Sequence, residues 1–229
     1  MITKAMIFAA GFGTRMKALT ADCPKPLLTV GSITLLDHVI SLARDCGIKQ
    51  IVINAHYQHQ KITRHVNAQP DIKVSVETSD ILETGGGLKN ALPLLGDEPI
   101  LTLNSDLLFP DENPLQNLIE NWNPNKMDAL LLLIDRQNAL QHHGQGDFDL
   151  KHPIAPIKRC SGSSASHVFT GAQIINPAAL HNIAEQNFSI SKLWDIYTQH
   201  DRVWGMNMSG RWVDVGHPEG LQYAQQLMA

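Results

Sequence analysis

The segment that decides the fold is Lys4-Ala5-Met6-Ile7-Phe8-Ala9-Ala10-Gly11-Phe12-Gly13-Thr14-Arg15-Met16. Its apolar first part, Lys4–Ala9, predicts a strand that runs directly into a glycine turn. Turns of this kind are where α/β folds bind phosphate groups, because their exposed N–H groups form a concave anion site. Gly11 and Gly13 also allow a ligand to come close to the main chain. The segment therefore predicts a phosphate-binding loop at the end of the first strand.

Two cationic side chains follow this loop closely. Arg15 carries a planar guanidinium that suits phosphate oxygens, and Lys25 stands between two prolines that fix its backbone. A dinucleotide-binding G-x-G-x-x-G pattern does not fit, because Met16 replaces the third glycine, and no Gly-Lys-Ser/Thr follows for a Walker loop. A tight turn beside a surface lysine would explain the glycines, but it explains poorly why Gly-x-Gly-Thr-Arg and Pro-Lys-Pro occur together.

The composition sets limits on the class of protein. The chain has 229 residues, of which 43% are hydrophobic, and its formal net charge is −4. This length predicts one α/β domain over residues 1–229, and the charge gives no general attraction to nucleic acid or to anionic membranes. No apolar run is long enough to span a membrane. The three widely spaced cysteines indicate free thiols and a cytoplasmic location.

Apolar runs alternate with helical patterns through the first half of the chain. Strands are predicted at Lys4–Ala9, Ile51–Asn54, Lys73–Glu77, Ile100–Leu103 and Ala129–Ile134. Helices are predicted near Leu35–Cys46, Gln58–Asn67, Gly86–Leu94 and Pro114–Trp122. This alternation favours a mainly parallel sheet that is covered by helices on both faces.

After Ile134 the pattern changes to shorter segments that are bounded by turns. Strand-like stretches lie at Phe148–Leu150, Ala155–Ile157, His167–Phe169 and Ala172–Ile175, and helices are predicted near Ala178–Glu185, Ser191–Tyr197 and Pro218–Met228. We expect these strands to be antiparallel additions that cover the site.

Two aspartates are placed where α/β enzymes keep functional groups. Asp106 comes just after the buried strand Ile100–Leu103, and Asp214 lies in Trp212-Val213-Asp214-Val215-Gly216. Open α/β sheets bind ligands at the carboxyl ends of their strands. Asp106 could equally cap a helix, and Asp214 could simply end a strand.

The combination of Gly-x-Gly-Thr-Arg with Pro-Lys-Pro resembles the signature of the sugar-1-phosphate nucleotidyltransferases, and the resemblance extends over essentially the whole chain. It implies a Rossmann-like three-layer α/β/α fold with a mainly parallel central sheet and antiparallel additions. It also implies that the loop wraps a nucleoside triphosphate, which assigns nucleotide binding to Ala9, Ala10, Gly11, Phe12, Gly13 and Thr14. Arg15 would face the departing pyrophosphate and Lys25 would contact the reacting phosphates, and these two are the predicted catalytic residues.

The same resemblance implies a magnesium ion. Family members carry Asn-Gly-Asp after one strand and Trp-x-Asp-x-Gly near the C-terminus, and the two aspartates share Mg²⁺. These positions match Asp106 and Asp214 here, with Asn104 as a further nucleotide-binding residue, while Ser105 replaces the family's glycine. Mg²⁺ binds through few carboxylates and bridges phosphates, so two aspartates suffice.

A third glycine-rich run, Glu83-Thr84-Gly85-Gly86-Gly87, opens a predicted helix. Taken alone it could be a flexible hinge. It resembles the loop that reads the base in uridylyltransferases of the family, which implies UTP as the nucleotide and contacts from Thr84 and Gly85. Asn54, at the end of the second strand, has a counterpart in the family and is also assigned to the nucleotide.

The middle segments resemble those of family members that act on N-acetylmuramic acid 1-phosphate. The resemblance rests on His142–Phe148, Phe169-Thr170-Gly171 and Phe188-Ser189-Ile190. It assigns sugar binding to Asn138, Asp147, Thr170 and Gly171. Asn138 is the equivalent of an Asn-Pro that this chain lacks, because the segment Asp135–Gln141 is longer. His142 and His143 also fit a solvated pair, and a zinc site would need further ligands.

The expected reaction transfers a uridylyl group from UTP to this sugar 1-phosphate and releases pyrophosphate. A guanylyl-, cytidylyl- or thymidylyltransferase acting on a heptose, choline or hexose phosphate shares the first motif. A nucleotide-sensing regulatory subunit is the alternative outside the enzymes, although Lys25, Asp106 and Asp214 are all present. The sequence does not indicate an oligomeric state.

Overall fold

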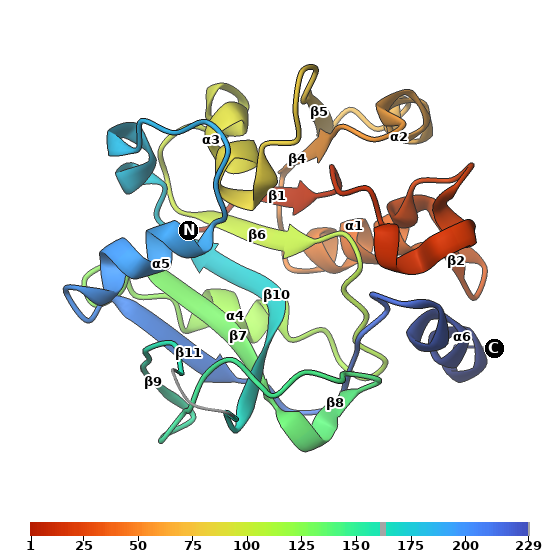
Figure 1. The fold of residues 1–229 in the computed structure, drawn as a ribbon. Helices are drawn as coiled ribbons and strands as arrows, with labels where there is room; N and C mark the ends of the chain where they lie inside the picture. The colour runs from red at the N-terminus through yellow and green to blue at the C-terminus, as the bar shows by residue number, and fades with distance from the viewer. Residues whose placement is uncertain (161–163, 229) are drawn as a thin grey trace.

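The computed structural model describes residues 1–160 and 164–228, which build an eight-stranded central sheet (Figure 1). Its strands, in spatial order, are β5 (Ile72–Val76), β4 (Gln50–Ala55), β1 (Lys4–Phe8), β6 (Ile100–Asn104), β10 (His167–Ile175), β7 (Ala129–Asp135), β11 (Val203–Asn207) and β9 (Ile154–Pro156). Only β10 and β9 run against their neighbours among these described strands. The sheet is therefore mainly parallel, as the sequence predicts.

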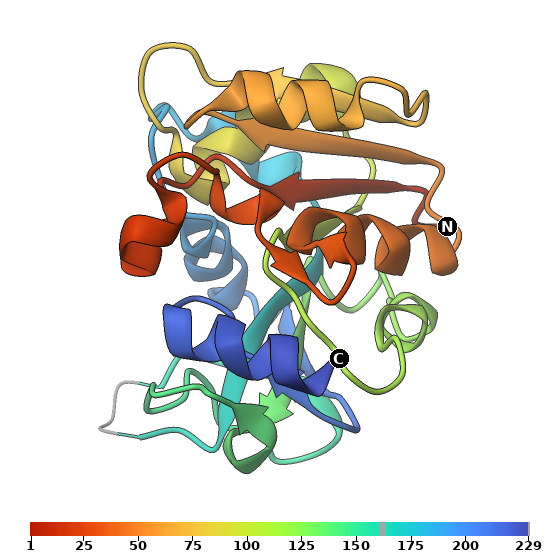
Figure 2. The ribbon, with the colours of Figure 1, turned by 90° about the vertical axis from the view of Figure 1, so that its right-hand side faces the viewer.

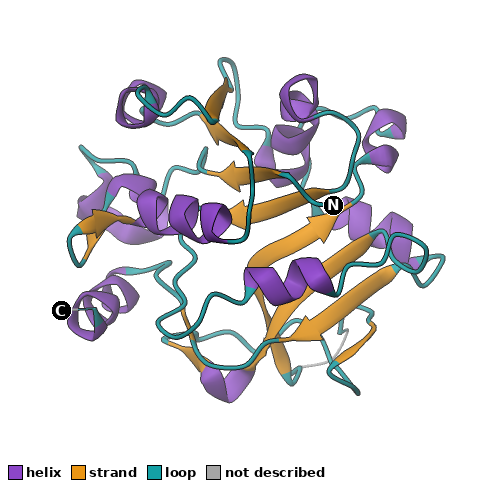
Figure 3. Ribbon diagram, turned by 180° about the vertical axis from the view of Figure 1, so that it is seen from behind, coloured by secondary structure: helices purple, strands orange, loops and turns teal. Residues whose placement is uncertain are grey.

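Helices cover both faces of this sheet, and Figure 3 shows the strands between them. One face packs against α1 (Leu35–Asp45), α2 (His59–Val66) and α4 (Leu115–Glu120). The other packs against α3 (Glu83–Leu95), η4 (Ala178–Asn182) and α5 (Ser191–Thr198). Successive residues of β1 point to opposite cores: Ile7 joins the first and Met6 the second, so the strand is apolar from Ala5 onward. The predicted three-layer α/β/α fold of Rossmann-like type is confirmed.

The last helix, α6 (Pro218–Leu227), closes a third and smaller core. Figure 2 looks onto the side of the molecule that carries α1 and α6. Leu221 of α6 belongs to the same buried cluster as Met16 and Val30. The short elements of this region are η1 (Thr14–Thr20), η2 (Lys25–Leu27), β2 (Thr29–Val30), β3 (Ile33–Thr34), η3 (Arg136–Asn138), β8 (Ala139–Leu140) and β12 (Trp212–Val213). The C-terminal helix thus supports the segment that follows the phosphate loop.

The antiparallel strands form near the predicted residues, with β9 at Ile154–Pro156 for the expected Ala155–Ile157, but their place in the fold differs from the prediction. The two stretches expected at His167–Phe169 and Ala172–Ile175 form one strand, β10, which lies inside the sheet between β6 and β7 and does not cover the site. The pairing shifts between Phe169 and Gln173, where Gly171 has φ +97°, and this irregularity divides the sequence pattern. The strand expected at Phe148–Leu150 is wrong, because only Phe148 pairs, through isolated bridges.

The helix boundaries also differ from the sequence pattern. α3 begins at Glu83, three residues before the predicted start, and the helix expected at Ala178–Glu185 is the shorter 3₁₀ turn Ala178–Asn182. The strand β11 escaped prediction because it is short and has Gly205 at its centre. Within the described ranges, no helix combines the length and apolarity needed to cross a membrane. Cys23, Cys46 and Cys160 are free thiols.

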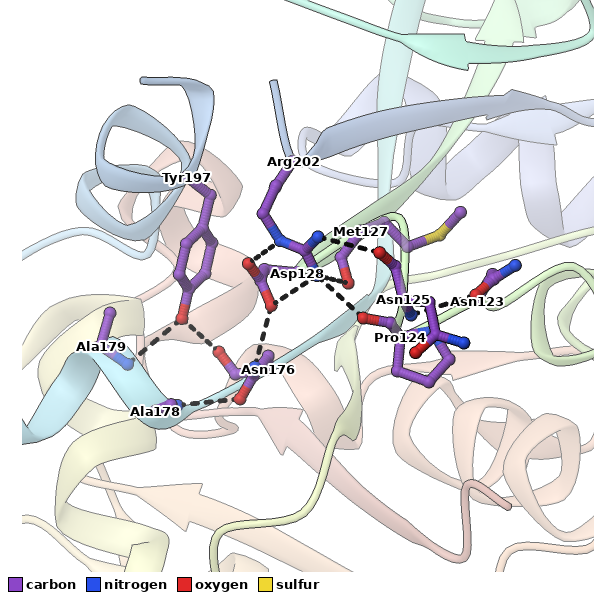
Figure 4. A network of polar contacts seen from close by, with 10 residues as sticks. All are labelled: Asn123, Pro124, Asn125, Met127, Asp128, Asn176, Ala178, Ala179, Tyr197 and Arg202. Atoms are coloured by element: carbon purple, nitrogen blue, oxygen red, sulfur yellow. Dashed lines mark hydrogen bonds and ion pairs between the residues drawn. The ribbon is translucent and has the colours of Figure 1, made fainter. Parts of the chain in front are cut away.

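A network of polar contacts closes the end of the sheet where β7 and β11 begin (Figure 4). Arg202 forms an ion pair with Asp128 and donates to the backbone carbonyls of Pro124, Asn125 and Met127 at 2.8–3.2 Å. Asn176, just beyond β10, donates to Asp128 at 2.9 Å. This network therefore joins the ends of three strands on the side opposite the carboxyl end of β1.

Candidate active site

A cleft of about 340 Å³ opens at the carboxyl ends of β1, β4 and β6. Nine residues predicted to belong to the site line it: Ala9, Ala10, Gly11, Arg15, Lys25, Asn54, Thr84, Asn104 and Asp106. Phe8, Pro26, Ile81, Glu83 and Ser105 also line the cleft and were not predicted. Segments far apart in the sequence therefore meet at one edge of the sheet, as expected for an open α/β fold.

The phosphate loop is shaped by Gly13. Its φ is +64°, and a Cβ at this position would lie 3.1 Å from Cβ of Lys25 and 3.1 Å from a methyl of Thr20. The Thr20 hydroxyl donates to the Gly13 carbonyl at 3.1 Å, and this bond helps to hold the turn in its conformation. A side chain at Gly11 would meet nothing within 4 Å, so this residue leaves open space in the cleft. The turn thus packs tightly at Gly13 and stays open at Gly11.

The tip of the loop leans away from the cleft. The ring of Phe12 is 45% exposed and packs edge-on against His56, with 5.5 Å between ring centroids. Thr14 begins η1 and is exposed. Phe12, Gly13 and Thr14 are outside the set of described residues that line the cleft, although they continue the loop that does.

Lys25 forms an ion pair with Asp106 in the floor of the cleft. The short η2 turn holds Lys25 in place, because Leu27 donates to the Pro24 carbonyl at 2.9 Å and Leu28 donates to the Lys25 carbonyl at 3.0 Å. The Lys25 side chain is only 12% exposed. A cation held this close to a carboxylate can exchange part of that contact for a phosphate oxygen when a ligand arrives.

The C-terminal segment Trp212–Gly216 approaches the cleft residue Arg15 at Gly216. A Cβ on Gly216 would lie 3.1 Å from the terminal nitrogens of Arg15 and 2.7 Å from Oδ1 of Asp214. Only a residue without a side chain allows the Arg15 guanidinium and the Asp214 carboxylate to approach this backbone together. The predicted metal ligand Asp214 therefore lies beside the predicted catalytic Arg15, although 199 positions separate them in the sequence.

Asp214 is held as a carboxylate by its neighbours. The Gly216 N–H donates to Oδ1 at 2.8 Å, and Nδ1 of His142 lies 3.2 Å from Oδ2. Burial alone would raise the pKa of the Asp214 carboxyl, but the hydrogen bonds from His142 and Gly216 and the charge of His142 hold that pKa below its usual value. His142 is thus part of the site and not a solvated loop residue.

The donors around the cleft fit a hard divalent cation. Asp106 lines the cleft, and Asp214, which is outside that lining set, lies beside the cleft residue Arg15. Within residues 1–160 and 164–228, no group of three or more His, Cys, Asp or Glu side chains is placed to hold a metal by itself. Mg²⁺ is usually held by one or two carboxylates together with substrate phosphates, so the two aspartates match its requirement.

The glycine-rich start of α3 is packed against protein. The N–H groups of Gly85 and Gly86 both donate to the Phe188 carbonyl, at 2.9 and 3.0 Å, and Thr84 accepts from the Ile190 N–H at 2.9 Å. A Cβ on Gly85 would lie 2.5 Å from the ring of Phe188. These contacts explain why the helix needs glycine here. Thr84 still lines the cleft, whereas Gly85 is behind it.

The residues predicted to bind the sugar lie outside the set that lines this cleft in the described chain. Asp147 accepts from the Phe169 N–H at 2.8 Å, and the buried Thr170 hydroxyl donates to the Leu132 carbonyl at 3.0 Å. Asn138 ends the η3 turn. Gly171 lies against the cleft residue Asn104, whose amide nitrogen would be 2.5 Å from an added Cβ. Of the four, only Gly171 contacts the cleft wall directly.

Sequence reasoning missed Glu77 and the role of His142. Glu77 is 3% exposed and accepts hydrogen bonds from Asn54 at 2.7 Å and from the Leu82 N–H at 2.9 Å. His142 contacts an aspartate 72 positions away. Glu77 lies in no recognised motif, and the motif that contains His142 does not indicate its contact with Asp214, so only their partners in space reveal these roles.

The fold and this cleft define a sugar-1-phosphate nucleotidyltransferase, and comparisons with known proteins agree. Residues 5–184 match the family described as MobA-like NTP transferase domain. The chain belongs to this family.

Relatives support the same class along the whole chain. The chain is 32% identical to the N-acetylmuramate alpha-1-phosphate uridylyltransferase of Caulobacter vibrioides, covering 98% of this chain and 96% of that protein. It is also 32% identical to the enzyme of the same name from Neisseria meningitidis, covering 98% and 97%. A putative glucose-1-phosphate thymidylyltransferase from Bacillus anthracis, solved with sucrose, shares the fold with a TM-score of 0.82 at 20% identity, over 98% of this chain and 94% of that one.

Proposed function

We propose that this enzyme transfers a uridylyl group from UTP to N-acetylmuramic acid 1-phosphate, giving a UDP-sugar and pyrophosphate. The observation that carries the chemistry is the cleft in which Lys25, Asp106 and Arg15 meet beside the phosphate loop. The choice of substrates is supported by the 32% identity to two enzymes named for this reaction, over nearly their full lengths.

The reaction is an in-line displacement at phosphorus. A phosphate oxygen of the sugar 1-phosphate forms a bond to the α-phosphorus of UTP, and the bond from that phosphorus to the oxygen bridging the β-phosphate breaks. The electron pair leaves with pyrophosphate. Because a phosphate monoester is already nucleophilic at neutral pH, the barrier lies in bringing two anions together. Catalysis is therefore positioning and charge stabilisation.

The chain's own residues supply these two effects. Lys25 bridges the α-phosphate and the sugar phosphate, and Arg15 with the amides of the loop from Ala9 to Gly13 holds the departing phosphates. His142 keeps the Asp214 carboxylate oriented and ionised through its Nδ1 contact at 3.2 Å. Asp106 and Asp214 would hold Mg²⁺, which when bound neutralises phosphate charge during the displacement.

The proposed acceptor sugar has one chemical group that a related sugar lacks. N-acetylmuramic acid differs from N-acetylglucosamine by a lactyl ether, which adds one carboxylate. Lys158 and Arg159 do not supply its partner, because both are outside the residues that line the cleft. Lys158 pairs with Asp201, next to Arg202 at the opposite end of the sheet, and Arg159 lies over the ring of Trp194 at 5.4 Å. Discrimination that rests on a satisfied polar contact can be large, whereas a merely roomy pocket accepts both sugars.

The test is pyrophosphate release with purified enzyme. We expect the highest kcat/KM with UTP and N-acetylmuramic acid 1-phosphate, and a clear loss with N-acetylglucosamine 1-phosphate. UTP, GTP, CTP and dTTP are then compared with the better sugar. A preference for N-acetylglucosamine 1-phosphate, or for another nucleotide, would overturn this assignment of substrates while leaving the nucleotidyltransferase class intact.

A further inference from the structure

A buried carboxylate lies directly behind the wall of the cleft. Glu77 follows the last residue of β5 and is 3% exposed. Its backbone is fixed at both ends, because its N–H donates to the Ala55 carbonyl at 2.9 Å and its own carbonyl lies 2.8 Å from Nδ1 of His56. Among the described residues, no Lys, Arg or His nitrogen comes within 4 Å of its carboxylate. A buried acidic group without a cation is retained only where its hydrogen bonds matter.

Both carboxylate oxygens are used, and the donors come from two different walls. Oε1 accepts from Nδ2 of Asn54 at 2.7 Å, and Oε2 accepts from the Leu82 N–H at 2.9 Å. Oδ1 of Asn54 in turn accepts from the Ala9 N–H at 2.9 Å. Because a backbone N–H can only donate, the Ala9 contact fixes which way the Asn54 amide faces. The NH₂ group must then point at Glu77 and needs an acceptor there.

The helix α3 packs closely against Asn54 and Glu77 at Gly87. A Cβ on Gly87 would lie 2.6 Å from Nδ2 of Asn54 and 2.9 Å from Oε1 of Glu77. A side chain at position 87 therefore does not fit between that helix and the pair. Glu77 is the acceptor that this arrangement requires, and glycine at position 87 is what allows it to approach.

The chain of hydrogen bonds joins the two walls of the cleft. Ala9 begins the phosphate loop, and Leu82 directly precedes Glu83 and Thr84 on the opposite wall. The path Ala9–Asn54–Glu77–Leu82 therefore fixes the distance between the loop that faces the phosphates and the segment that faces the rest of the nucleotide. A shift of either wall requires one of these buried bonds to break.

We propose that Glu77 is a positioning residue for nucleotide binding: its two oxygens set the separation of the cleft walls without touching the ligand. The proposal rests on the proposed function only in the choice of UTP as the probe. A glutamine at this position has one acceptor oxygen and one NH₂ group, so it can serve only one of the two donors.

Exchanging the amide of Asn54 and the carboxylate of Glu77 tests this set of hydrogen bonds. Glu77→Gln leaves an NH₂ group facing a donor, and Asn54→Asp brings two carboxylates together. The double variant Asn54→Asp with Glu77→Gln restores every bond: the new carboxylate accepts from Ala9 and from the glutamine NH₂, and the glutamine oxygen accepts from the Leu82 N–H. The total charge of the pair is also unchanged in this double variant.

The measurement is steady-state pyrophosphate release well below the melting temperature of each variant. We expect each single variant to raise the KM for UTP by about tenfold or more, because a buried donor or acceptor is left without a partner. The kcat should stay within about threefold, since the reacting groups are untouched. The double variant should lower the KM about threefold or more relative to Asn54→Asp alone, a comparison in which any direct effect of an aspartate at this cleft position cancels. Glu98→Gln, an exposed glutamate made amide, is the matched control and should match the wild type.

Two outcomes would overturn the proposal. One is a Glu77→Gln enzyme with the same KM as the Glu98→Gln control, whether or not its melting temperature falls. The other is a double variant whose KM for UTP is no lower than that of Asn54→Asp alone. If the wild type prefers another nucleotide, the proposed function fails instead, and the same three variants are compared with that nucleotide.

Discussion

At the end of the sheet where β7 and β11 begin, Arg202 is surrounded by oxygen acceptors of the protein itself (Figure 4). At the end where β1 and β6 finish, Arg15 lies over the Gly216 backbone, and among the described residues no carboxylate oxygen comes within 4 Å of it. Both guanidinium groups lie close to backbone, but Arg202 donates to three backbone carbonyls, whereas no hydrogen bond from the Arg15 side chain occurs among the described residues. The difference separates a cation that stabilises the fold from one that is left available for an anionic ligand.

The largest effect is expected for Lys25→Ala. Because Lys25 serves the reacting phosphates, turnover should fall by about 10²–10³-fold, the range for losing one electrostatic group at a reaction centre. Its loop is held by backbone bonds, so the melting temperature should change little. Pyrophosphate release is the measurement, and Lys49→Ala, at an exposed lysine, is the control. Near-normal turnover of Lys25→Ala would remove this residue from the catalytic group.

The next effect concerns the predicted metal ligands. We expect EDTA to abolish activity and added Mg²⁺ to restore it. Asp106→Asn and Asp214→Asn should each raise the Mg²⁺ concentration needed for half-maximal turnover by about tenfold or abolish turnover, because an amide is a poorer ligand for a hard cation. Titration of Mg²⁺ against initial rate measures this. Full activity of the doubly substituted enzyme in chelator would exclude the two-aspartate site.

At the opposite end of the sheet, we expect a substitution to lower the stability of the fold and to leave the activity unchanged. Arg202→Met removes the ion pair with Asp128 and three bonds to backbone carbonyls. We expect a loss of about 2 kcal/mol in the free energy of unfolding, as is typical of charged hydrogen bonds. The kcat/KM should be unchanged at temperatures below the transition. Urea unfolding and initial rates, measured together, check both parts. A loss of activity without loss of stability would break the comparison between the two ends.

The smallest effect is a pH dependence at the same end. Tyr197 donates to the Asn176 carbonyl at 2.6 Å, and burial raises the pKa of its phenol to about 12. The neutral phenol is favoured in the folded state, so its contribution is complete below pH 10 and is lost as the pH rises toward 12. Between these pH values the wild type should lose about 1–2 kcal/mol more stability than Tyr197→Phe. Parallel stability curves for the two proteins would show that Tyr197 titrates normally.

Local patterns were enough for much of the fold and part of the site. The run Lys4–Ala9 and the glycine turn after it predict both the central strand β1 and the phosphate loop, because strand and turn signals are local. The end of a strand also predicts Asp106, since parallel strands finish at one edge of a sheet, whereas Asn54 and Asn104 were assigned through the family resemblance. All of these except the turn tip line the cleft.

The tertiary structure decided what joins these parts. It inserted β10 into the sheet between β6 and β7 and used the Gly85 and Gly86 amides to hold the Phe188 carbonyl. It also placed Glu77 behind Asn54 and His142 beside Asp214. The physical reason is that periodicity and turn chemistry act over a few residues, whereas a buried hydrogen bond depends on which donor the fold brings to an acceptor. The sequence by itself predicted a phosphate-binding loop at the end of the first strand, and only the folded chain determined how the walls of the cleft beside that loop are held.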